Sequence, residues 1–505
     1  MRRTMRRTFA RAAFGAGLAL HLSLGFAQAG DSGEQACRLT AKSLPAAFAR
    51  CRVLDVPLDP AAPDGPTIEL FVARIAALST SPQPDPLLII TGGPGQSTVD
   101  FYLQLRGAFE QVRRDRDLIL VDQRGTGRSA AGFACDVPQD LALETAGAEE
   151  LNRFVDRCLA ALEHDPRFYT TSVAVGDLDR VRAALELEQW NLYGVSYGTR
   201  VAQHYLRRFP ERVRAVILDG VVPAEIALGP EVAIFAQRAL DAIFARCGQE
   251  PECGTRFGNL PVRFAELLAR LRAQPVEAQA AALAGAPASE KDSASFGAAH
   301  LQALARFMSY STQTAALLPL VFSEAHAGNY EPLIAQAQTI LRDLPEALSF
   351  PMSNAVVCTE DAPFMSVSIP GLDATFLGTA IVDALSNICA RWPAGVLDDD
   401  FKQPVVSDQP VLLLSGEADP VTPPEYAERA IAGGLTNSVH LIGRAQGHGL
   451  AAVGCVPRLM RAFLQTPEPT MLGGRFSCTT AKPTVAWRTR SNTVRRCSRP
   501  LSSSS

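Results

Sequence analysis

Short apolar runs that end in turn-forming residues recur along the chain and predict β-strands. From residue 86 to residue 415 these runs are nearly continuous in apolar side chains. That pattern is typical of strands covered on both faces of a parallel sheet. We expect strands at residues 69–76, 86–91, 117–121, 190–194, 215–219, 410–415 and 438–442.

Amphipathic helical patterns separate several of these runs. Residues 177–187 place Leu178, Val181 and Leu185 on one helical face, and the pattern at residues 199–208 ends before Pro210. Strands that alternate with helices predict an α/β fold with a mostly parallel central sheet and right-handed crossovers.

The alternation stops between about residue 226 and residue 402, where the pattern is almost wholly helical. We expect helices at residues 230–247, 262–273, 298–308, 332–341 and 374–390, and a surface excursion in the alanine-rich residues 275–295. Strand patterns resume at residue 410. The simplest interpretation is one α/β domain interrupted by a large helical insertion.

The first 29 residues have the order of a secretory signal peptide: a basic head, a short apolar run and a small-x-small cleavage site at residues 27–29. An uncleaved membrane anchor is the alternative, which we favour less because the run is short and begins with glycine and alanine. Arg6 and Arg7 leave the twin-arginine export route open. We therefore expect an exported protein, periplasmic or extracellular.

Eleven cysteines are present, and none lies in a CxxC motif or beside clustered histidines, so we expect no metal site. In an exported protein they are typical of disulfides. As a hypothesis we pair chain neighbours: Cys37–Cys51, Cys135–Cys158, Cys247–Cys253, Cys358–Cys389 and Cys455–Cys478, with Cys497 left over.

The formal net charge is −4, and removal of the signal segment takes away five arginines and no acid. The chain after Glu468 has seven basic residues and no acid, so the body from residue 30 to residue 468 carries −16. An acidic body argues against nucleic-acid binding. For the basic C-terminal tail, residues 471–505, we favour a disordered end over a binding arm. We expect no membrane association after signal removal, and the oligomeric state stays open.

The segment Gly194-Val195-Ser196-Tyr197-Gly198 follows a predicted strand and opens a predicted helix. It has the Gly-x-Ser-x-Gly pattern of a nucleophile elbow, in which a strained turn exposes the serine. Side chains two residues on either side of that serine would clash, so glycine fits there. We interpret Ser196 as a nucleophile; a purely structural turn is the alternative.

A serine nucleophile needs a histidine base oriented by an acid, and this architecture requires the order serine, acid, histidine. We favour His448, in a Gly-His-Gly loop after the last predicted strand, over His440, which lies inside that strand. Asp419 follows the strand at residues 410–415 and is our candidate acid. Asp219 and Glu417 are its rivals, although Asp219 is more typical of a strand-end residue that bonds nearby backbone.

Two further turns follow predicted strands. Gly92-Gly93-Pro94-Gly95 is a turn in which Gly93, together with the N–H of Tyr197, is a candidate oxyanion hole. The turn at residues 122–129 lacks the lysine of a phosphate loop, so we interpret most of it as structural.

Together these motifs resemble the prolyl and tripeptidyl aminopeptidase family of α/β-hydrolase fold peptidases. That family has the Gly-Gly-Pro-Gly turn, an Asp-Gln-Arg-Gly-x-Gly-x-Ser turn and the Gly-x-Ser-Tyr-Gly elbow in this order, here at residues 92–95, 122–129 and 194–198. The elbow and the cysteine content look closer to the secreted tripeptidyl aminopeptidase branch. One difference is Thr91, where family members often have histidine.

The resemblance implies an α/β-hydrolase fold with two core parts, residues 30–225 and 403–470, around a helical cap at residues 226–402. It also implies release of residues or short peptides from a substrate with a free N-terminus, without metal or cofactor. Glu360 and Asp361, adjacent acids in the cap, are candidates to bind the substrate ammonium group; a solvated charge at a helix end is an equal alternative.

Two other functions remain open. A carboxylesterase or lipase would use the same triad, because the fold alone does not determine the substrate. A non-catalytic binding protein on a hydrolase scaffold is the third hypothesis, against which the intact triad argues.

Overall fold

An 11-stranded sheet organises the chain in a computed structural model that describes residues 33–137, 147–279, 293–366, 369–468, 487–488 and 494–495. Its strands are β1 (Gln35–Leu39), β2 (Ala47–Pro57), β3 (Thr67–Ile75), β4 (Leu87–Ile90), β5 (Leu118–Val121), β6 (Trp190–Val195), β7 (Val213–Asp219), β10 (Val411–Gly416), β11 (Ser438–Gly443), β12 (Trp487–Arg488) and β13 (Val494–Arg495). A separate hairpin pairs β8 (Val276–Gln279) with β9 (Ser293–Phe296).

The sheet order is β1-β2-β3-β5-β4-β6-β7-β10-β11-β12-β13. The strands from β5 through β4, β6, β7 and β10 to β11 are parallel, and the strands flanking them are antiparallel. The seven strands expected from the apolar pattern are confirmed. The pattern missed β1 and β2, whose residues are largely exposed or half-buried and therefore lack a continuous apolar run.

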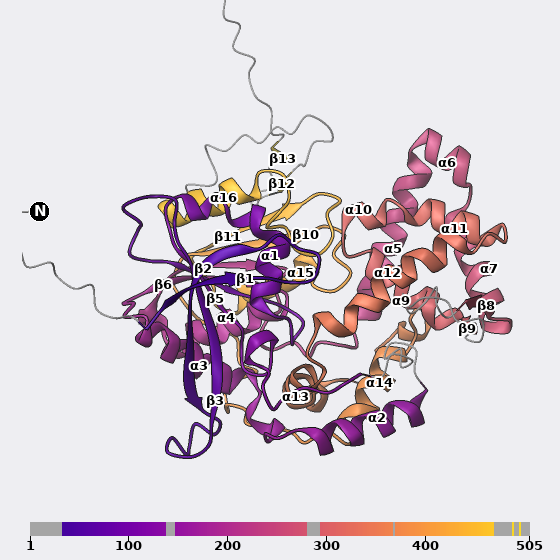
Figure 1. Ribbon diagram of the computed structural model, residues 1–505. Helices are drawn as coiled ribbons and strands as arrows, with labels where there is room; N and C mark the ends of the chain where they lie inside the picture. Colours follow the sequence, from indigo (N-terminus) through magenta and orange to yellow (C-terminus); the bar gives the residue numbers. More distant parts are fainter. Residues whose placement is uncertain are drawn as a thin grey trace, which may run out of the picture. The chain divides into compact units, whose positions relative to one another are not determined.

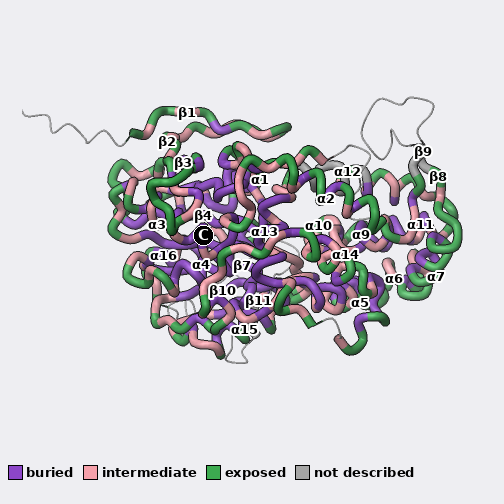
Figure 2. Tube along the Cα trace, turned by 90° about the horizontal axis from the view of Figure 1, so that it is seen from below, coloured by how far each residue is buried: buried purple, intermediate pink, exposed green. Residues whose placement is uncertain are grey.

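Helices lie on both faces of the sheet and in the insertion. They are α1 (Thr98–Phe109), α2 (Ala148–Ala161), α3 (Thr171–Ala184), α4 (Tyr197–Arg208), α5 (Val232–Gln249), α6 (Pro251–Phe257), α7 (Leu260–Ala273), α9 (Ala298–Met308), α10 (Thr312–Ala315), α11 (Leu318–His326), α12 (Glu331–Ala347), α13 (Phe350–Glu360), α14 (Ala380–Cys389), α15 (Pro424–Gly433) and α16 (Val456–Gln465). Apolar side chains of α3, α4 and α15 pack on one face, and those of α1 and α16 pack on the other. Because both faces are covered, β4, β5 and β6 are buried at every position. Figure 2 shows the same contrast between the buried central strands and the exposed β1.

The helices α5, α7, α9, α11 and α12 of the insertion share an apolar core of their own, and Figure 1 shows them grouped to one side of the large sheet, together with the β8–β9 hairpin. The insertion is nevertheless not a free module, since Met352, Ala355 and Val356 of α13 belong to the core cluster of the sheet. The helix expected at residues 374–390 begins later, at Ala380. It is preceded by a short 3-10 turn and by Gly378, whose φ is +55°.

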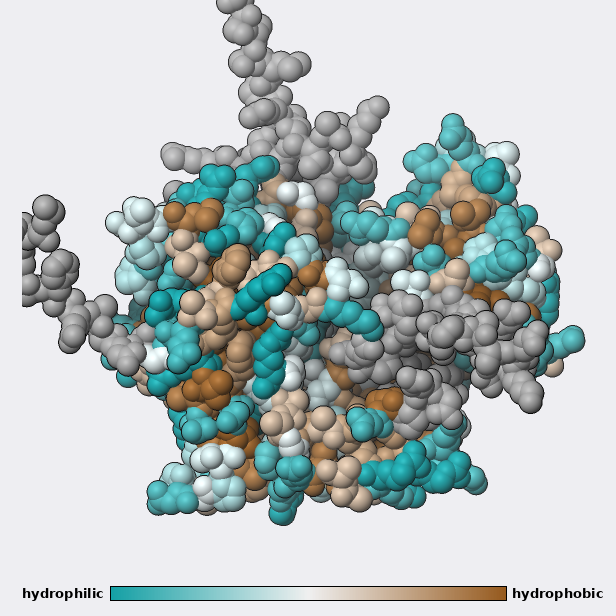
Figure 3. Space-filling view, viewed as in Figure 1, coloured by the Kyte–Doolittle hydropathy of each residue, from teal (hydrophilic) through white to brown (hydrophobic). Residues whose placement is uncertain are grey.

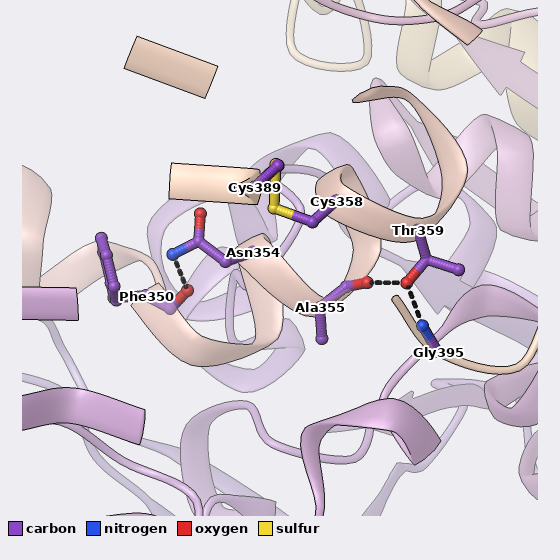
Figure 4. Close-up of a disulfide and its surroundings, with 7 residues drawn as sticks. All are labelled: Phe350, Asn354, Ala355, Cys358, Thr359, Cys389 and Gly395. Carbon is purple, nitrogen blue, oxygen red and sulfur yellow. Dashed lines mark hydrogen bonds between the residues drawn. A yellow bond between two sulfur atoms is a disulfide. The ribbon is translucent and has the colours of Figure 1, made fainter. Parts of the chain in front are cut away.

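Disulfide bonds link segments within the sheet-containing part of the chain and within the helical insertion. Four of the expected pairs form, namely Cys37–Cys51, Cys135–Cys158, Cys247–Cys253 and Cys358–Cys389. Cys455 is also disulfide-bonded, whereas Cys478 and Cys497 lie outside the described residues. Figure 4 shows Cys358 joining α13 to α14, next to Thr359, whose hydroxyl accepts the N–H of Gly395.

Three predicted segments fall partly or wholly outside the described residues. The signal peptide, residues 1–29, is one of them, and the alanine-rich segment 275–295, of which residues 280–292 are not described, is another. Of the basic tail only β12 and β13 are described, and they extend the sheet beyond β11.

On the face in Figure 3, hydrophobic side chains lie in small groups among hydrophilic ones. Within the described ranges, no helix has the length and apolar character that crossing a membrane requires.

Candidate active site

Ser196 occupies a sharp turn between β6 and α4, where its φ of 55° and ψ of −127° lie outside the ordinary regions for a residue with a side chain. Its N–H donates to the carbonyl of Asp219 at the end of β7, 2.9 Å away. The strand-turn-helix context expected for the elbow is therefore present.

The two glycines of the elbow are required by close packing. A β-carbon on Gly194 would overlap the carbonyl of Gly198, and one on Gly198 would overlap the carbonyl of Ile90 in β4. Because β6 and α4 approach each other and β4 this closely, only glycine fits on either side of Ser196.

His448 and Asp419 meet at the carboxyl edge of the sheet. Nδ1 of His448 lies 2.8 Å from Oδ2 of Asp419. Asp419 follows β10 and His448 follows β11, which are parallel neighbours, so both loops leave the sheet at the same edge.

Thr422 is a third member of this contact that the sequence reasoning missed. Its hydroxyl donates to Oδ2 of Asp419 at 2.8 Å and lies 3.1 Å from Nδ1 of His448. The N–H groups of Val421 and Thr422 both donate to Oδ1 of Asp419 at 2.9 Å. The carboxylate is thus fixed on both oxygens, and the signal in the sequence was Thr422 itself, the polar residue three positions after Asp419.

Ser196 and His448 both lie next to the end of β7, where Asp219 contacts Ser196 and Gly220 lies beside His448. A β-carbon on Gly220, next to the Asp219 carbonyl that holds Ser196, would lie 3.1 Å from Cε1 of His448. Among the described residues no hydrogen bond joins Ser196 to His448. In enzymes without substrate such bonds are often long and tighten only in the complex.

Asp219, the rival acid, has a structural role. Its carboxylate is fully buried and accepts the N–H groups of Leu450 and Ala451 and the hydroxyl of Tyr193, all within 2.9 Å. It therefore anchors the loop that carries His448, as expected for a strand-end residue bonded to backbone. Burial raises its pKa. The rival base, His440, is packed in β11 with Nε2 2.9 Å from Oγ of Ser415.

The pKa of His448 is raised above its ordinary value. Burial has the largest influence and lowers this pKa, but the charge of Asp419 and its hydrogen bond to the ring together outweigh burial. The protonated imidazole is thus stabilised where it would form during proton transfer.

The turn at residues 92–95 passes over the elbow. A β-carbon on Gly92 would lie 2.9 Å from Cβ of Ser196 and 3.4 Å from its Oγ. The Gly93–Pro94 peptide bond is cis. Thr91 donates its hydroxyl to the carbonyl of Gln96 and so closes the turn. Of the candidate oxyanion residues, Gly93 directly follows Gly92, and Tyr197 directly follows Ser196.

Glu360 and Asp361 do not lie where a substrate can reach them. They are 0% and 1% exposed, at the end of α13. The carboxylate of Asp361 accepts hydrogen bonds from both terminal nitrogens of Arg200, at 2.8 and 3.1 Å, and from the N–H of Leu228. Glu360 accepts the N–H and hydroxyl of Thr171, at 2.7 and 2.9 Å. This structure therefore provides no support for an ammonium-binding role.

The two carboxylates instead tie the insertion to the elbow helix. Arg200 lies on α4, one turn after Ser196, and is fully buried. The hydroxyl of Thr171 also contacts that of Tyr197 at 2.7 Å. Burial raises the pKa of Glu360 to about 7, partly opposed by Arg200. The sequence reasoning missed Arg200 and Thr171 because nothing local marks their partners.

The turn at residues 122–129 is structural, as expected for most of it. Asp122 is buried and accepts the hydroxyl of Ser97 and the N–H groups of Val99 and Arg128. Arg124 pairs with Asp177 of α3 through two hydrogen bonds, at 2.6 and 2.9 Å.

Comparison with known proteins agrees with this architecture. Residues 85–251 match the sequence model of the alpha/beta hydrolase fold family. Residues 374–475 match the model described as TAP-like protein. The expected fold and the expected resemblance are both confirmed.

The chain is 34% identical over 192 residues to serine protease Hip1 of Mycobacterium tuberculosis. The aligned region covers 34% of this chain and 36% of that protein. It is 32% identical over 190 residues to a tripeptidyl aminopeptidase of Streptomyces lividans, covering 34% and 35%. It is 28% identical over 230 residues to carboxylesterase B of M. tuberculosis, covering 41% and 43%. The matches thus span well under half the length of these relatives.

Proposed function

We propose that this chain, which has the α/β-hydrolase fold, is a serine peptidase that releases single residues or short peptides from free N-termini. The observation that carries the proposal is the 2.8 Å contact between His448 and Asp419, at the sheet edge where the strained elbow presents Ser196. The match to the TAP-like model and the similarity to a tripeptidyl aminopeptidase support the peptidase assignment.

In the proposed mechanism Ser196 attacks the carbonyl carbon of the scissile amide while His448 takes its proton. Asp419 orients the imidazole and stabilises its protonated form. The N–H groups of Gly93 and Tyr197 stabilise the oxyanion, and loss of one such donor typically costs about 2.7–4 kcal/mol. His448 then protonates the leaving amine, and water releases the acyl group from Ser196.

A panel of anilides tests this assignment. Substrates of one, two and three residues are compared with free and acetylated N-termini, with Ser196→Ala as the control. We expect turnover of free-amine substrates that acetylation abolishes. Equal turnover of acetylated substrates would refute the aminopeptidase assignment.

Carboxylesterase activity is the second candidate, favoured by the similarity to carboxylesterase B. The same triad hydrolyses esters, so the two functions differ only in the substrate. Rapid ester turnover with no release from any free-amine anilide identifies an esterase. Absence of Ser196 labelling by a fluorophosphonate identifies a non-catalytic protein.

The proposal includes export. The support is the set of disulfides within the described ranges, because such bonds persist in oxidising compartments. Cell fractionation with detection of the cleaved N-terminus checks this, and intact precursor in the cytoplasm would refute it.

A further inference from the structure

Arg306, at the end of α9 in the insertion, carries a positive charge that no described carboxylate neutralises. Its guanidinium lies over the rings of Phe307 and Tyr310, with the carbon 5.0 and 6.0 Å from their centroids. Its Nη2 lies 3.3 Å from the Tyr310 hydroxyl. Its Nε is buried and has no hydrogen-bond partner within the part of the chain that the structure describes. Two aromatic faces thus hold the cation in place without cancelling its charge.

Tyr310 connects this cation to the candidate base. The Tyr310 and His448 rings meet edge-on with centroids 5.2 Å apart. The carbonyl of Tyr310 accepts the N–H of His448 at 2.7 Å. The pKa of His448 is lowered mainly by burial and raised mainly by Asp419. The positive charge of Arg306 lowers this pKa further. Arg306 therefore acts electrostatically on the imidazole.

The chemistry of the base indicates where the leaving group lies. His448 delivers a proton to the leaving amine, so the leaving group passes beside the imidazole. Tyr310 packs against that ring, and Arg306 packs against Tyr310. A guanidinium binds carboxylates through paired N–H donors, and these bonds are among the strong ones in proteins.

We propose that Arg306, positioned by Phe307 and Tyr310, binds a carboxylate of the leaving peptide and so determines specificity on the leaving-group side. This inference rests on the proposed function. The carboxylate is either the C-terminus of a short peptide substrate or an acidic side chain just after the cleaved bond, and both present the same chemistry to the guanidinium.

Three matched substrates separate these sources. The first is a short peptide with a free C-terminal carboxylate, the second is the same peptide as its amide, and the third is the amide with glutamate directly after the cleaved bond. We expect wild type to favour at least one carboxylate substrate over the plain amide. In Arg306→Gln the ratio of kcat/KM between that substrate and the amide falls about tenfold, mainly through KM. Arg306→Lys restores part of the ratio.

The matched control is Arg272→Gln, which removes the same charge from an exposed position on α7 and leaves the ratio unchanged. Labelling of Ser196 by a fluorophosphonate reports that each variant is folded. An equal loss on all three substrates, or no change in the ratio, overturns the proposal. If wild type cleaves esters but no peptide, the proposed function fails first. Esters with a carboxylate or an amide on the alcohol then test Arg306 separately.

Discussion

The backbone N–H of His448 donates to the carbonyl of Tyr310, 2.7 Å away, so a residue of the helical insertion holds the loop of the candidate base. On its other side the same loop is held by Asp219, which accepts the N–H groups of Leu450 and Ala451. A β-carbon on Gly447 would overlap the Tyr310 carbonyl. The insertion thus contributes to the geometry of the candidate site.

Replacement of the nucleophile gives the first prediction. We expect Ser196→Ala to lower kcat by at least about 10⁴-fold, because the attacking oxygen is lost. The melting temperature should change little, since no described hydrogen bond depends on that hydroxyl. Anilide turnover and fluorophosphonate labelling measure the effect. Activity within tenfold of wild type would remove Ser196 from the mechanism.

The second prediction concerns Thr422, whose hydroxyl bridges Asp419 and His448. Thr422→Val keeps the shape of the side chain but leaves Oδ2 of Asp419 without one donor. We expect kcat to fall about 10- to 100-fold, since a hydrogen bond to a charged group contributes about 1.5–3 kcal/mol. KM should stay close to wild type. Thr422→Ser is the control, and a serine variant as slow as the valine variant would contradict a role for the hydroxyl.

The raised pKa of His448 predicts the pH dependence of activity. Attack requires the neutral imidazole, so kcat/KM rises with pH and reaches half its maximum above pH 6.5, the ordinary histidine value. The same shift affects stability. The protonated ring is favoured in the folded protein, so its contribution is complete below the unfolded pKa and is lost as pH rises through the folded pKa. A pH profile with a midpoint below 6.5 would contradict this prediction.

The buried pair of Arg200 and Asp361 gives a prediction about stability. Arg200→Met leaves the buried Asp361 and Glu360 without the guanidinium that both contact, while Lys402 stays 3.6 Å from Asp361. We expect a loss of about 3–5 kcal/mol of unfolding free energy. Arg238→Met is the matched control, because Arg238 pairs with Glu425 on the surface and such pairs contribute about 0–1 kcal/mol. Urea unfolding measures both, and equal losses would show that burial does not matter here.

The glycine turn beside Ser196 gives the last prediction. A methyl group at Gly92 would lie 2.9 Å from Cβ of Ser196, so Gly92→Ala displaces either the nucleophile or the oxyanion turn. We expect a loss of about 100-fold in kcat, the typical effect of a displacement near 1 Å. Gly107→Ala in α1, with no atom within 4 Å of the added methyl group, should keep full activity. An active Gly92→Ala would show that the turn tolerates the shift.

The sequence was informative wherever a signal is local. The central strands are continuous apolar runs because both faces of the sheet are covered, so their positions along the chain were predictable. The elbow glycines could be predicted because any side chain two positions before or after Ser196 would overlap neighbouring backbone. Four disulfides follow from cysteines that are neighbours in the chain.

The other features of the site depend on contacts between residues that are far apart in the sequence, and no local sequence pattern indicates such contacts. Glu360 and Asp361 have the composition of a binding pair, yet their partners Arg200 and Thr171 lie more than a hundred residues earlier, and only the fold brings them together. Tyr310 and Arg306 carry no motif, and their relation to His448 exists because the insertion folds back onto the loop after β11. The sequence by itself therefore determined the central strands of the sheet, the elbow and the candidate triad residues, whose signals are short-range. Only the tertiary structure decided which charges are buried against each other and which cation faces the base, because burial and pairing arise from packing between distant segments.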